Sequence, residues 1–379
     1  MKYKYWLINA MVGLASGAII LSIISYIIDP IGQWESPIIA GLNNNKKSQR
    51  EFLDVFKPFQ VVNHEADMIY IGSSRIFVGF RTEEYAYNMA ASSLSLADMK
   101  EYLHLVYSHH IPQKIYIGLD LFQFSASSLS QQRAGFSHER NQIVQNGGLA
   151  LFSEKLKTNL GMIKYVPNTV YESICHKEKE PPFIRGYYQE VGEANELIPK
   201  EYYYSLHDYY TIYTKSDYGE NAPIDCLADI LQEASEHDVE IVLFFNPISI
   251  DLQALQDICG RQEAFADIKR KVAALHPVYD FAWVSPLTMD RKNSWSDGSH
   301  YFGRVGDRLK MTMNYTPEDE LFDSAICRYL VSSTIENHLL EERDLYDRWR
   351  VDNEDYIHTL SHVSPNQIPD KALYEFIGF

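Results

Sequence analysis

Three short segments of the chain combine the residue types that serine-based acyl chemistry requires. Gly72-Ser73-Ser74-Arg75 follows an apolar run and opens a helical pattern, so a serine there is exposed near backbone N–H groups that can hold an oxyanion. Asp297 and His300 are close enough in sequence for the carboxylate to orient one imidazole nitrogen while the other takes a serine proton. Asp120 ends another apolar run. The three segments are candidates for parts of a Ser-His-Asp site.

Each segment also has a purely structural interpretation. A serine at the start of a helix is the preferred N-cap residue, whatever its chemistry. Asp355 and His358 repeat the Asp-x-x-His spacing in a helical tail, where contacts between solvated side chains are ordinary. The position of Asp297 and His300 after the last predicted strand, rather than their spacing, therefore favours this pair as the candidate. Asp120 could face a site or cap the segment that follows it.

The elements that must position these segments follow an α/β pattern. Short apolar runs predict strands at residues 67–72, 87–90, 114–120, 239–245 and 278–281. Helical patterns at 94–108, 223–237 and 262–275 separate them. Such alternation predicts right-handed crossovers and a parallel sheet with helices on both faces, a three-layer α/β/α flavodoxin-like fold with strand order 2-1-3-4-5. Sites in such sheets form at the carboxyl ends of the strands, where the three segments fall.

The α/β pattern does not extend over the whole chain. We expect a transmembrane anchor at residues 1–30, a neck at 31–65 and an α/β domain at 66–316. The stretch at about 125–222 lacks the strand–helix rhythm and is expected to be an insertion. An amphipathic pattern predicts a helical tail at 317–379.

Composition excludes several classes of function. The chain has 34 Lys and Arg against 51 Asp and Glu, a formal net charge of −17. This balance argues against nucleic acid as a partner and against adhesion to anionic lipid by charge. The four cysteines, Cys175, Cys226, Cys259 and Cys327, lack the spacing of a zinc site. They are expected to be mostly buried free thiols, with a disulfide as the alternative in an oxidising compartment.

The N-terminus predicts a membrane anchor. No charged residue occurs from Tyr5 to Ile28, which is long enough as a helix to cross about 30 Å of hydrocarbon. Lys2 and Lys4 precede this run and Asp29 follows it, so the positive-inside rule leaves the N-terminus in the cytoplasm. A cleaved signal peptide is the alternative, but the run is long for one and no A-x-A site follows.

Five motifs in one order give the chain a specific resemblance. They are IYIGSSR, YNMAASSLSLADM, IYIGLDLFQF, VLFFNPIS and YDF…WSDGSHYFGRVGDRL. The set resembles the SGNH hydrolase superfamily of GDSL-like esterases, and within it the membrane-anchored bacterial members tied to acylation of envelope polysaccharides. The resemblance covers residues 67–124 and 221–312, and leaves out the insertion, neck and tail.

The resemblance implies roles for individual residues. The family's Gly-x-Ser nucleophile falls on Ser74, and its Asp-x-x-His pair falls on Asp297 and His300. Ser93 stands near the place of the glycine that donates to the oxyanion, and Asp120 stands where the family has a donating asparagine. Arg75 completes the predicted oxyanion and substrate site. An ionised Asp120 would repel an oxyanion, so the triad looks complete while the oxyanion hole looks altered.

Two functions of different classes follow. The first is hydrolysis or transfer of an acyl group, most simply acetyl, on an envelope or exported polysaccharide, without metal or organic cofactor. The second is a catalytically degenerate accessory protein that keeps the fold within a polysaccharide export or acylation complex. Either would sit in the inner membrane by a single helix, with the ectodomain in the periplasm or outside the cell. Expected partners are the cytoplasmic membrane, a glycan and a membrane protein of that complex.

A cluster of tyrosines in the insertion has two open interpretations. Sugar rings stack on exposed aromatic side chains, so the cluster is a candidate glycan groove. Packing of the insertion is an equally good explanation. The residues are Tyr202, Tyr203, Tyr204, Tyr209, Tyr210 and Tyr213.

Overall fold

The computed structural model describes residues 2–130, 133, 135–194 and 196–361, and the chain divides into two compact units. The first unit gathers residues 1–65, 104–110 and 133–184. The second gathers residues 66–103, 111–132 and 185–379. The stretch expected as one insertion at 125–222 is thus shared: 133–184 groups with the N-terminal segment, whereas 125–132 and 185–222 group with the α/β domain. Residues 362–379 of the expected tail lie outside the described part.

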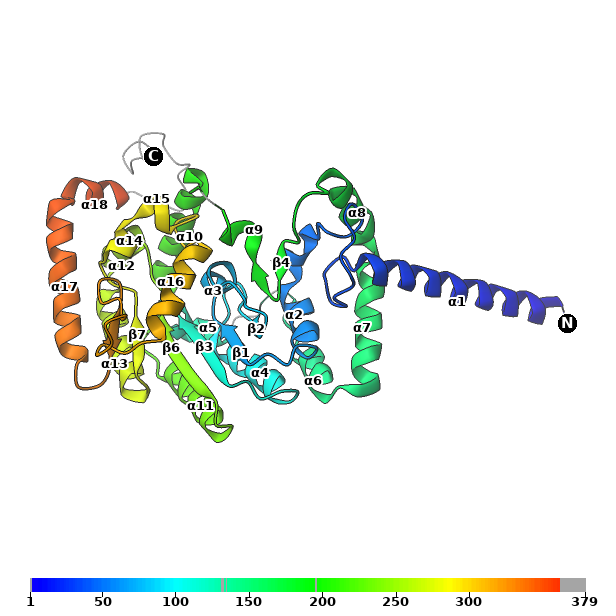
Figure 1. Cartoon of the computed structure of the whole chain (residues 1–379), viewed down its shortest axis with the longest axis horizontal. Helices are drawn as coiled ribbons and strands as arrows, with labels where there is room; N and C mark the ends of the chain where they lie inside the picture. Colours follow the sequence, from blue (N-terminus) through cyan, green and yellow to red (C-terminus); the bar gives the residue numbers. More distant parts are fainter. Residues whose placement is uncertain (1, 131–132, 134, 195, 362–379) are drawn as a thin grey trace. The chain divides into compact units, whose positions relative to one another are not determined.

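The second unit is built on a mostly parallel sheet. Its strands, in the part of the chain that the structure describes, are β1 Met68–Ile71, β2 Ala86–Asn88, β3 Lys114–Leu119, β6 Glu240–Phe245, β7 Val278–Asp280 and β8 Arg328–Leu330. They lie in the order β2-β1-β3-β6-β7-β8 (Figure 1), and only β8 runs antiparallel to its neighbour. The five predicted strands are present in the predicted order. The added β8 falls where only helix was expected.

The central strands are buried, as their sequences require. The register of β3 and β6 runs from Lys114 opposite Glu240 to Leu119 opposite Phe245. Apart from the half-buried Ile241, the apolar residues between these ends are almost fully buried, since parallel strands are covered on both faces. Both strands therefore end at the same edge of the sheet, next to Asp120 and Asn246.

Helices and short turns connect the strands of the second unit. The first half contains α3 Ser74–Gly79, α4 Leu96–Tyr107, η2 Leu121–Phe124, α5 Ala126–Ser130, the two-residue strand β5 Tyr187–Tyr188, α9 Gln189–Gly192 and α10 Pro199–Lys215. The second half contains α11 Ala222–Glu236, α12 Ile250–Ile258, α13 Gln262–Leu275, α14 Pro286–Met289, α15 Arg291–Ser294, α16 Gly303–Met313, α17 Ile335–Asp352 and α18 Glu354–Leu360. The last turn of α4 groups with the first unit.

Helices α3 and α16 approach each other closely through glycine. A Cβ added to Gly306 would lie 1.8 Å from the carbonyl oxygen of Gly79. A Cβ added to Gly79 would lie 2.0 Å from the ring of Tyr301. This close packing matters because α3 begins at Ser74 and α16 begins three residues after His300. The glycines thus hold the serine turn beside the histidine loop.

Gly306→Ala is expected to lower the free energy of unfolding by about 1–3 kcal/mol, because the clash is with backbone rather than with a flexible side chain. Urea unfolding followed by circular dichroism measures the change. Met311→Ala on the exposed side of the same helix is the control, and should change stability by less than about 0.5 kcal/mol. Equal effects of the two substitutions would contradict the close packing of α3 and α16.

The first unit is helical. Its elements are α1 Lys2–Ile28, η1 Lys47–Phe52, α2 Leu53–Val61, α6 His138–Asn146, α7 Gly148–Met162, η3 Ile163–Tyr165, α8 Val166–Cys175 and the two-residue strand β4 Phe183–Ile184. Tyr3–Ile28 is long and apolar enough to cross a membrane, and most of it is exposed. By length and composition this helix could cross a membrane, which agrees with the coarser part of the prediction, and its role as an anchor stays a prediction.

All four cysteines are free thiols. Cys175 is exposed, Cys226 and Cys259 are half-buried, and Cys327 is buried. The sequence-based expectation of free thiols therefore agrees with the structure, but their burial is less complete than expected.

Candidate active site

The two serines in the turn between β1 and α3 differ in position and exposure. Ser73 is the N-cap of α3, and its Oγ accepts a hydrogen bond from the backbone N–H of Arg75 at 3.3 Å. Its side chain is buried. Ser74 occupies the first position of the helix and is only half-buried. The structural interpretation therefore applies to Ser73, and Ser74 keeps a hydroxyl available for chemistry.

Asp297 and His300 form the ordered pair that their spacing predicted. His300 Nδ1 lies 2.7 Å from Asp297 Oδ2. The other oxygen, Oδ1, accepts the backbone N–H groups of Ser299 and His300, each at 2.8 Å. The loop is closed by an antiparallel bridge between Trp295 and Tyr301. The carboxylate is thus held in one orientation by its own loop.

The electrostatics of the pair suit a carboxylate that positions an imidazole. Burial alone would raise the pKa of Asp297, but the charge and hydrogen bond of His300, with the two backbone N–H groups, outweigh burial and lower it. Asp297 is therefore ionised at neutral pH. When the imidazole of His300 is neutral, the hydrogen bond to this carboxylate places its proton on Nδ1 and leaves a lone pair on Nε2.

His300 Nε2 is buried and has no hydrogen-bond partner. No hydrogen bond joins it to Ser74 Oγ among the described residues. Catalytic hydrogen bonds are often long or misaligned before substrate binds, so this geometry leaves both groups as candidates. An unpartnered buried nitrogen is costly in a folded protein and therefore calls for an explanation.

Arg75 connects the serine turn to the histidine loop. Its Nε donates to the carbonyl oxygen of Ser299 at 3.0 Å, one residue before His300. The guanidinium also lies over the ring of Tyr209, 5.0 Å from its centroid, and Ser299 Oγ bonds to the Tyr209 hydroxyl at 3.2 Å. Arg75 follows Ser74 and Ser299 precedes His300, so the contact between Arg75 and Ser299 links the two segments.

Asp120 is the counterion of Arg75. The two side chains form an ion pair in which both are buried. The second carboxylate oxygen accepts Asn246 Nδ2 at 3.2 Å, and Tyr301 donates its hydroxyl to Asn246 Oδ1 at 3.0 Å. Burial would lower the pKa of Arg75, but the charge of Asp120 outweighs it and raises the pKa. The negative charge of Asp120 is thus compensated within the protein.

Asn246 and Tyr301 belong to the site but were not singled out from the sequence. Asn246 directly follows β6, at the same sheet edge as Asp120. A polar residue directly after a predicted strand was the sequence signal that could have identified it. A small pocket at this edge is lined by Arg75, Asp120, Tyr209 and Asn246, among others. The edge of the sheet therefore carries a polar network around Arg75.

Ser93 is not part of this hydrogen-bonded network. It is exposed, and no hydrogen bond in the described part of the chain links it to the other five predicted residues. Its backbone has φ 53°, in the left-handed region that costs a non-glycine residue about 1–2 kcal/mol. Strain of this kind clusters at functional sites, which is consistent with the predicted role of its N–H group.

Most of the tyrosine cluster serves packing. Tyr202, Tyr203 and Tyr213 are buried, and the Tyr202 hydroxyl donates to the buried Asp251. Asp251 also forms a bidentate pair with Arg291 at 2.7 and 2.8 Å. Only Tyr204 is exposed, since Tyr209 and Tyr210 are half-buried. The packing interpretation therefore holds for the buried three, and Tyr209 is the member that reaches the candidate site.

A second polar cluster lies on another part of the unit. Ligand atoms of Asp280, His338 and Glu342 lie within 4.8 Å of one another, a spacing that could hold a metal ion. Lys269 Nζ, however, lies 2.8 Å from Asp280 Oδ2 and 2.8 Å from Glu342 Oε1. The ammonium supplies the positive charge that a metal would otherwise provide, so these residues fit a buried ion-pair network.

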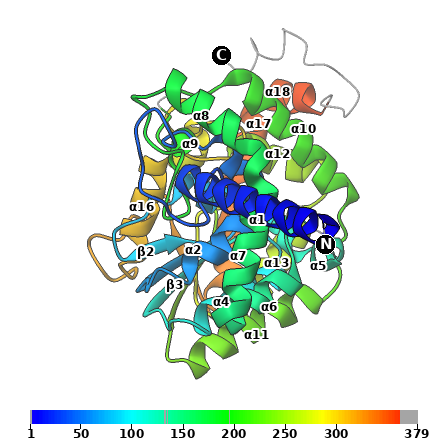
Figure 2. The same ribbon diagram turned by 90° about the vertical axis from the view of Figure 1, so that its right-hand side faces the viewer.

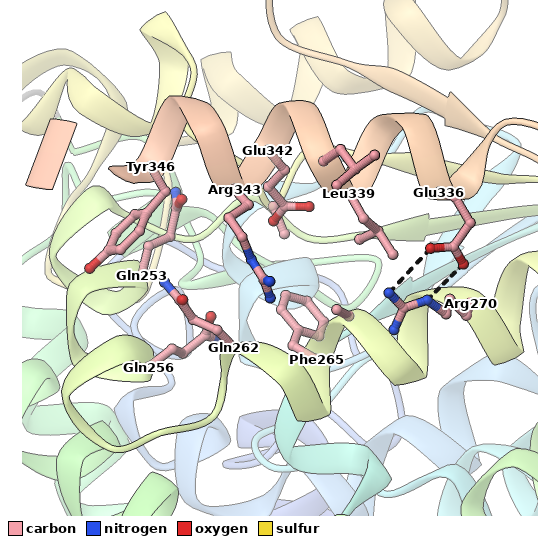
Figure 3. A pocket seen from close by; sticks show the side chains of 13 residues that line it. Gln253, Gln256, Gln262, Phe265, Arg270, Glu336, Leu339, Glu342, Arg343 and Tyr346 are labelled. Atoms are coloured by element: carbon pink, nitrogen blue, oxygen red, sulfur yellow. Dashed lines mark hydrogen bonds and ion pairs between the residues drawn. The ribbon is translucent and has the colours of Figure 1, made fainter. Parts of the chain in front are cut away.

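One cavity of the second unit is separate from the predicted residues. It has a volume of about 100 Å³ and lies where α12, α13 and α17 face one another (Figure 3). Arg270 and Glu336 form an ion pair across its edge at 2.8 Å. None of the six predicted site residues lines it. This cavity therefore gives no support to the Asp297–His300 pair as a functional site.

Comparison with models of known protein families and with curated proteins gives no match. The chemistry of the site accordingly rests on its own geometry.

Proposed function

We propose that the second unit is a Ser-His-Asp acyl ester hydrolase or O-acyltransferase of the SGNH type, with its sheet in a three-layer α/β/α arrangement. One observation carries this proposal: His300, oriented by Asp297, presents a buried and unpartnered Nε2 at the loop that Arg75 ties to the serine turn. The unpartnered nitrogen alone does not distinguish His300, since His338 Nδ1 is also unpartnered, so the proposal depends on its combination with the Asp297 contact and the Arg75 link.

The proposed reaction has two halves. His300 Nε2 takes the proton of Ser74 Oγ as the hydroxyl attacks the ester carbonyl, while Asp297 stabilises the imidazolium that forms. The tetrahedral intermediate collapses, and the leaving alcohol takes the proton from Nε2. Water or a sugar hydroxyl then gives its proton to Nε2 as it attacks the acyl-serine. The bond between the acyl group and Ser74 Oγ breaks, Oγ takes the proton back from Nε2, and the acid or the acylated sugar leaves. The N–H groups of Ser74 and Ser93 are the proposed oxyanion donors, and the reaction needs no metal or organic cofactor.

The proposed substrate is an acylated envelope or exported polysaccharide, and the acyl group is acetyl. The resemblance of the five motifs to membrane-anchored SGNH proteins supports this choice, as does the apolar helix α1. In this proposal α1 crosses the inner membrane once and the rest of the chain lies in the periplasm or outside the cell. A membrane protein of the same acylation complex is the proposed partner.

The test uses full-length protein in detergent and an acetylated polysaccharide. Wild type should release acetate, or move it to an added sugar acceptor, and His300→Ala should lose this activity, because Ser74 then lacks a base. Nuclear magnetic resonance of the acetyl signals separates release from transfer. His358→Ala is the matched control, since its spacing from Asp355 is the same but its side chain is exposed on α18. Equal activity of wild type and His300→Ala would exclude the proposed base.

A second function is favoured by a different observation. Ser74 and His300 share no hydrogen bond. Asp120, which stands at the family's oxyanion position, forms an ion pair with Arg75. A degenerate accessory protein that binds glycan or a membrane partner would have these features. Glycan binding without acetate release, unchanged in Ser74→Ala, would favour this function over catalysis.

The membrane orientation is open to a direct check. An alkaline phosphatase reporter fused after residue 40 should be active, because Lys2 and Lys4 keep the N-terminus in the cytoplasm and α1 carries the following chain across. A cytoplasmic reporter fused at the same residue is the control and should be inactive. The reverse pair of results would contradict the proposed localisation.

A further inference from the structure

Helix α7 of the first unit has its polar and apolar faces reversed relative to a helix in water. Lys155 and Asn159 are 7% and 2% exposed, whereas Leu149, Phe152 and Leu160 are 85%, 58% and 41% exposed. The three apolar residues follow a helical spacing that places them on one face, and the half-buried Leu156 lies between them. A helix surrounded by water buries the opposite set. The exposed apolar stripe of α7 therefore fits an apolar environment better than water.

The buried face of α7 is attached to the end of the anchor helix. Asn159 Nδ2 donates to the carbonyl oxygen of Ser22 at 3.1 Å, and Ser25 Oγ donates to Asn159 Oδ1 at 2.8 Å. Figure 2 shows α7 crossing α1 rather than continuing its direction. The uncharged run that ends at Ile28 is about 36 Å long as a helix, slightly more than the hydrocarbon thickness of a bilayer. If α1 spans, Ser22 and Ser25 lie near its outer boundary, and α7 lies there with them.

A row of aromatic side chains connects the end of α1 to α7. The ring of Tyr26 lies 5.5 Å from that of Trp34, and Trp34 lies 6.4 Å from Phe152. Lys155 Nζ lies 5.4 Å from the Trp34 ring centroid. Tryptophan, tyrosine and lysine at the boundary of a spanning helix are typical of the membrane interface. The cluster and the reversed helix thus point to the same environment.

We propose that a lipid bilayer covers the exposed face of α7, with Leu149, Phe152 and Leu160 in the boundary between headgroups and acyl chains. This inference rests on the membrane insertion of α1 under the proposed function. The interaction is driven by apolar burial rather than by charge, since the chain has a net charge of −17 and a single exposed Lys157 and Ser153 flank the apolar stripe. Helix α7 acts as an interfacial helix that fixes the first unit against the membrane.

The test places single spin labels on the full-length protein in phosphatidylcholine nanodiscs. The four native cysteines are replaced by alanine, and labels are attached in the variants Leu149→Cys and Phe152→Cys. Leu14→Cys in the middle of α1 is the lipid control, and Met311→Cys, exposed on α16, is the aqueous control. Electron paramagnetic resonance compares collisions of each label with oxygen, which enters lipid, and with a water-soluble nickel chelate.

The ratio of oxygen collisions to nickel collisions should be severalfold higher for the labels at positions 149 and 152 than for the label at position 311. It should approach the ratio for the label at position 14. Nickel access at 149 and 152, with 14 in lipid, would overturn the inference and leave the anchor intact. Shielding of 149 and 152 from both reagents would also overturn it, because protein, such as a second copy of the chain, would then cover the face. Nickel access at 14 itself would instead contradict the insertion of α1.

Discussion

Ser74→Ala is expected to reduce the rate of hydrolysis of an activated ester by about 10³-fold or more, because a Ser-His-Asp triad of the proposed kind works as a unit and fails when its nucleophile is removed. Ser74 opens α3 with a half-buried side chain and no capping task, so the substitution should leave the fold intact. Initial rates with p-nitrophenyl acetate, measured alongside circular dichroism spectra, separate loss of chemistry from loss of structure.

Ser73→Ala is the matched control for this experiment. Ser73 caps the same helix through Arg75 N–H, so its loss should cost about 1 kcal/mol of stability and change the ester rate by little. The two adjacent serines should thus separate stability from activity. Full activity in Ser74→Ala would show that the nucleophile is elsewhere, and loss of activity only in Ser73→Ala would transfer the role to that residue.

The buried pair of Arg75 and Asp120 gives the second large expected effect. Removing one partner leaves an uncompensated charge in the interior, so Arg75→Ala and Asp120→Ala should each lower the free energy of unfolding by about 3–5 kcal/mol. Urea unfolding followed by tryptophan fluorescence measures this loss. Since the two residues interact directly, the double variant should lose less than the sum of the single losses.

The control for this prediction is an ion pair of the same types at the surface. Arg308 and Asp323 lie 2.6 Å apart but are partly exposed, and breaking that pair should cost less than about 1 kcal/mol. Asp120→Asn adds a functional test, because the family resemblance expects asparagine at this position. If Asp120→Asn raised esterase activity without loss of stability, Asp120 would be an altered oxyanion residue rather than the counterion of Arg75.

The strands and the Asp297–His300 pair could be predicted from local sequence because their signals are local. Short apolar runs that end in glycine or aspartate suffice to place strands buried on both faces. The Asp-x-x-His spacing brings its carboxylate and imidazole together within one loop, without help from the rest of the fold. These features depend on neighbours in sequence, which a single chain displays directly.

The parts that could not be predicted depend on contacts between distant residues. The pairing of Arg75 with Asp120, and of Asn246 with Tyr301, is decided by which strand ends meet at one edge of the sheet. The strand β8 is three residues long and contains Arg328, so no apolar run marks it. The reversed polarity of α7 is visible only when its buried face is known, because its spacing alone fits a helix in water equally well.

The most direct test of the central claim is the location of a covalent adduct. Full-length wild type is treated with a fluorophosphonate, which reacts only with a serine activated by its base, and the modified peptide is identified by mass spectrometry. The proposed site predicts one adduct on Ser74 that is lost in His300→Ala and retained in His358→Ala. An adduct on another serine, or none on folded wild-type protein, would contradict a Ser74–His300–Asp297 site.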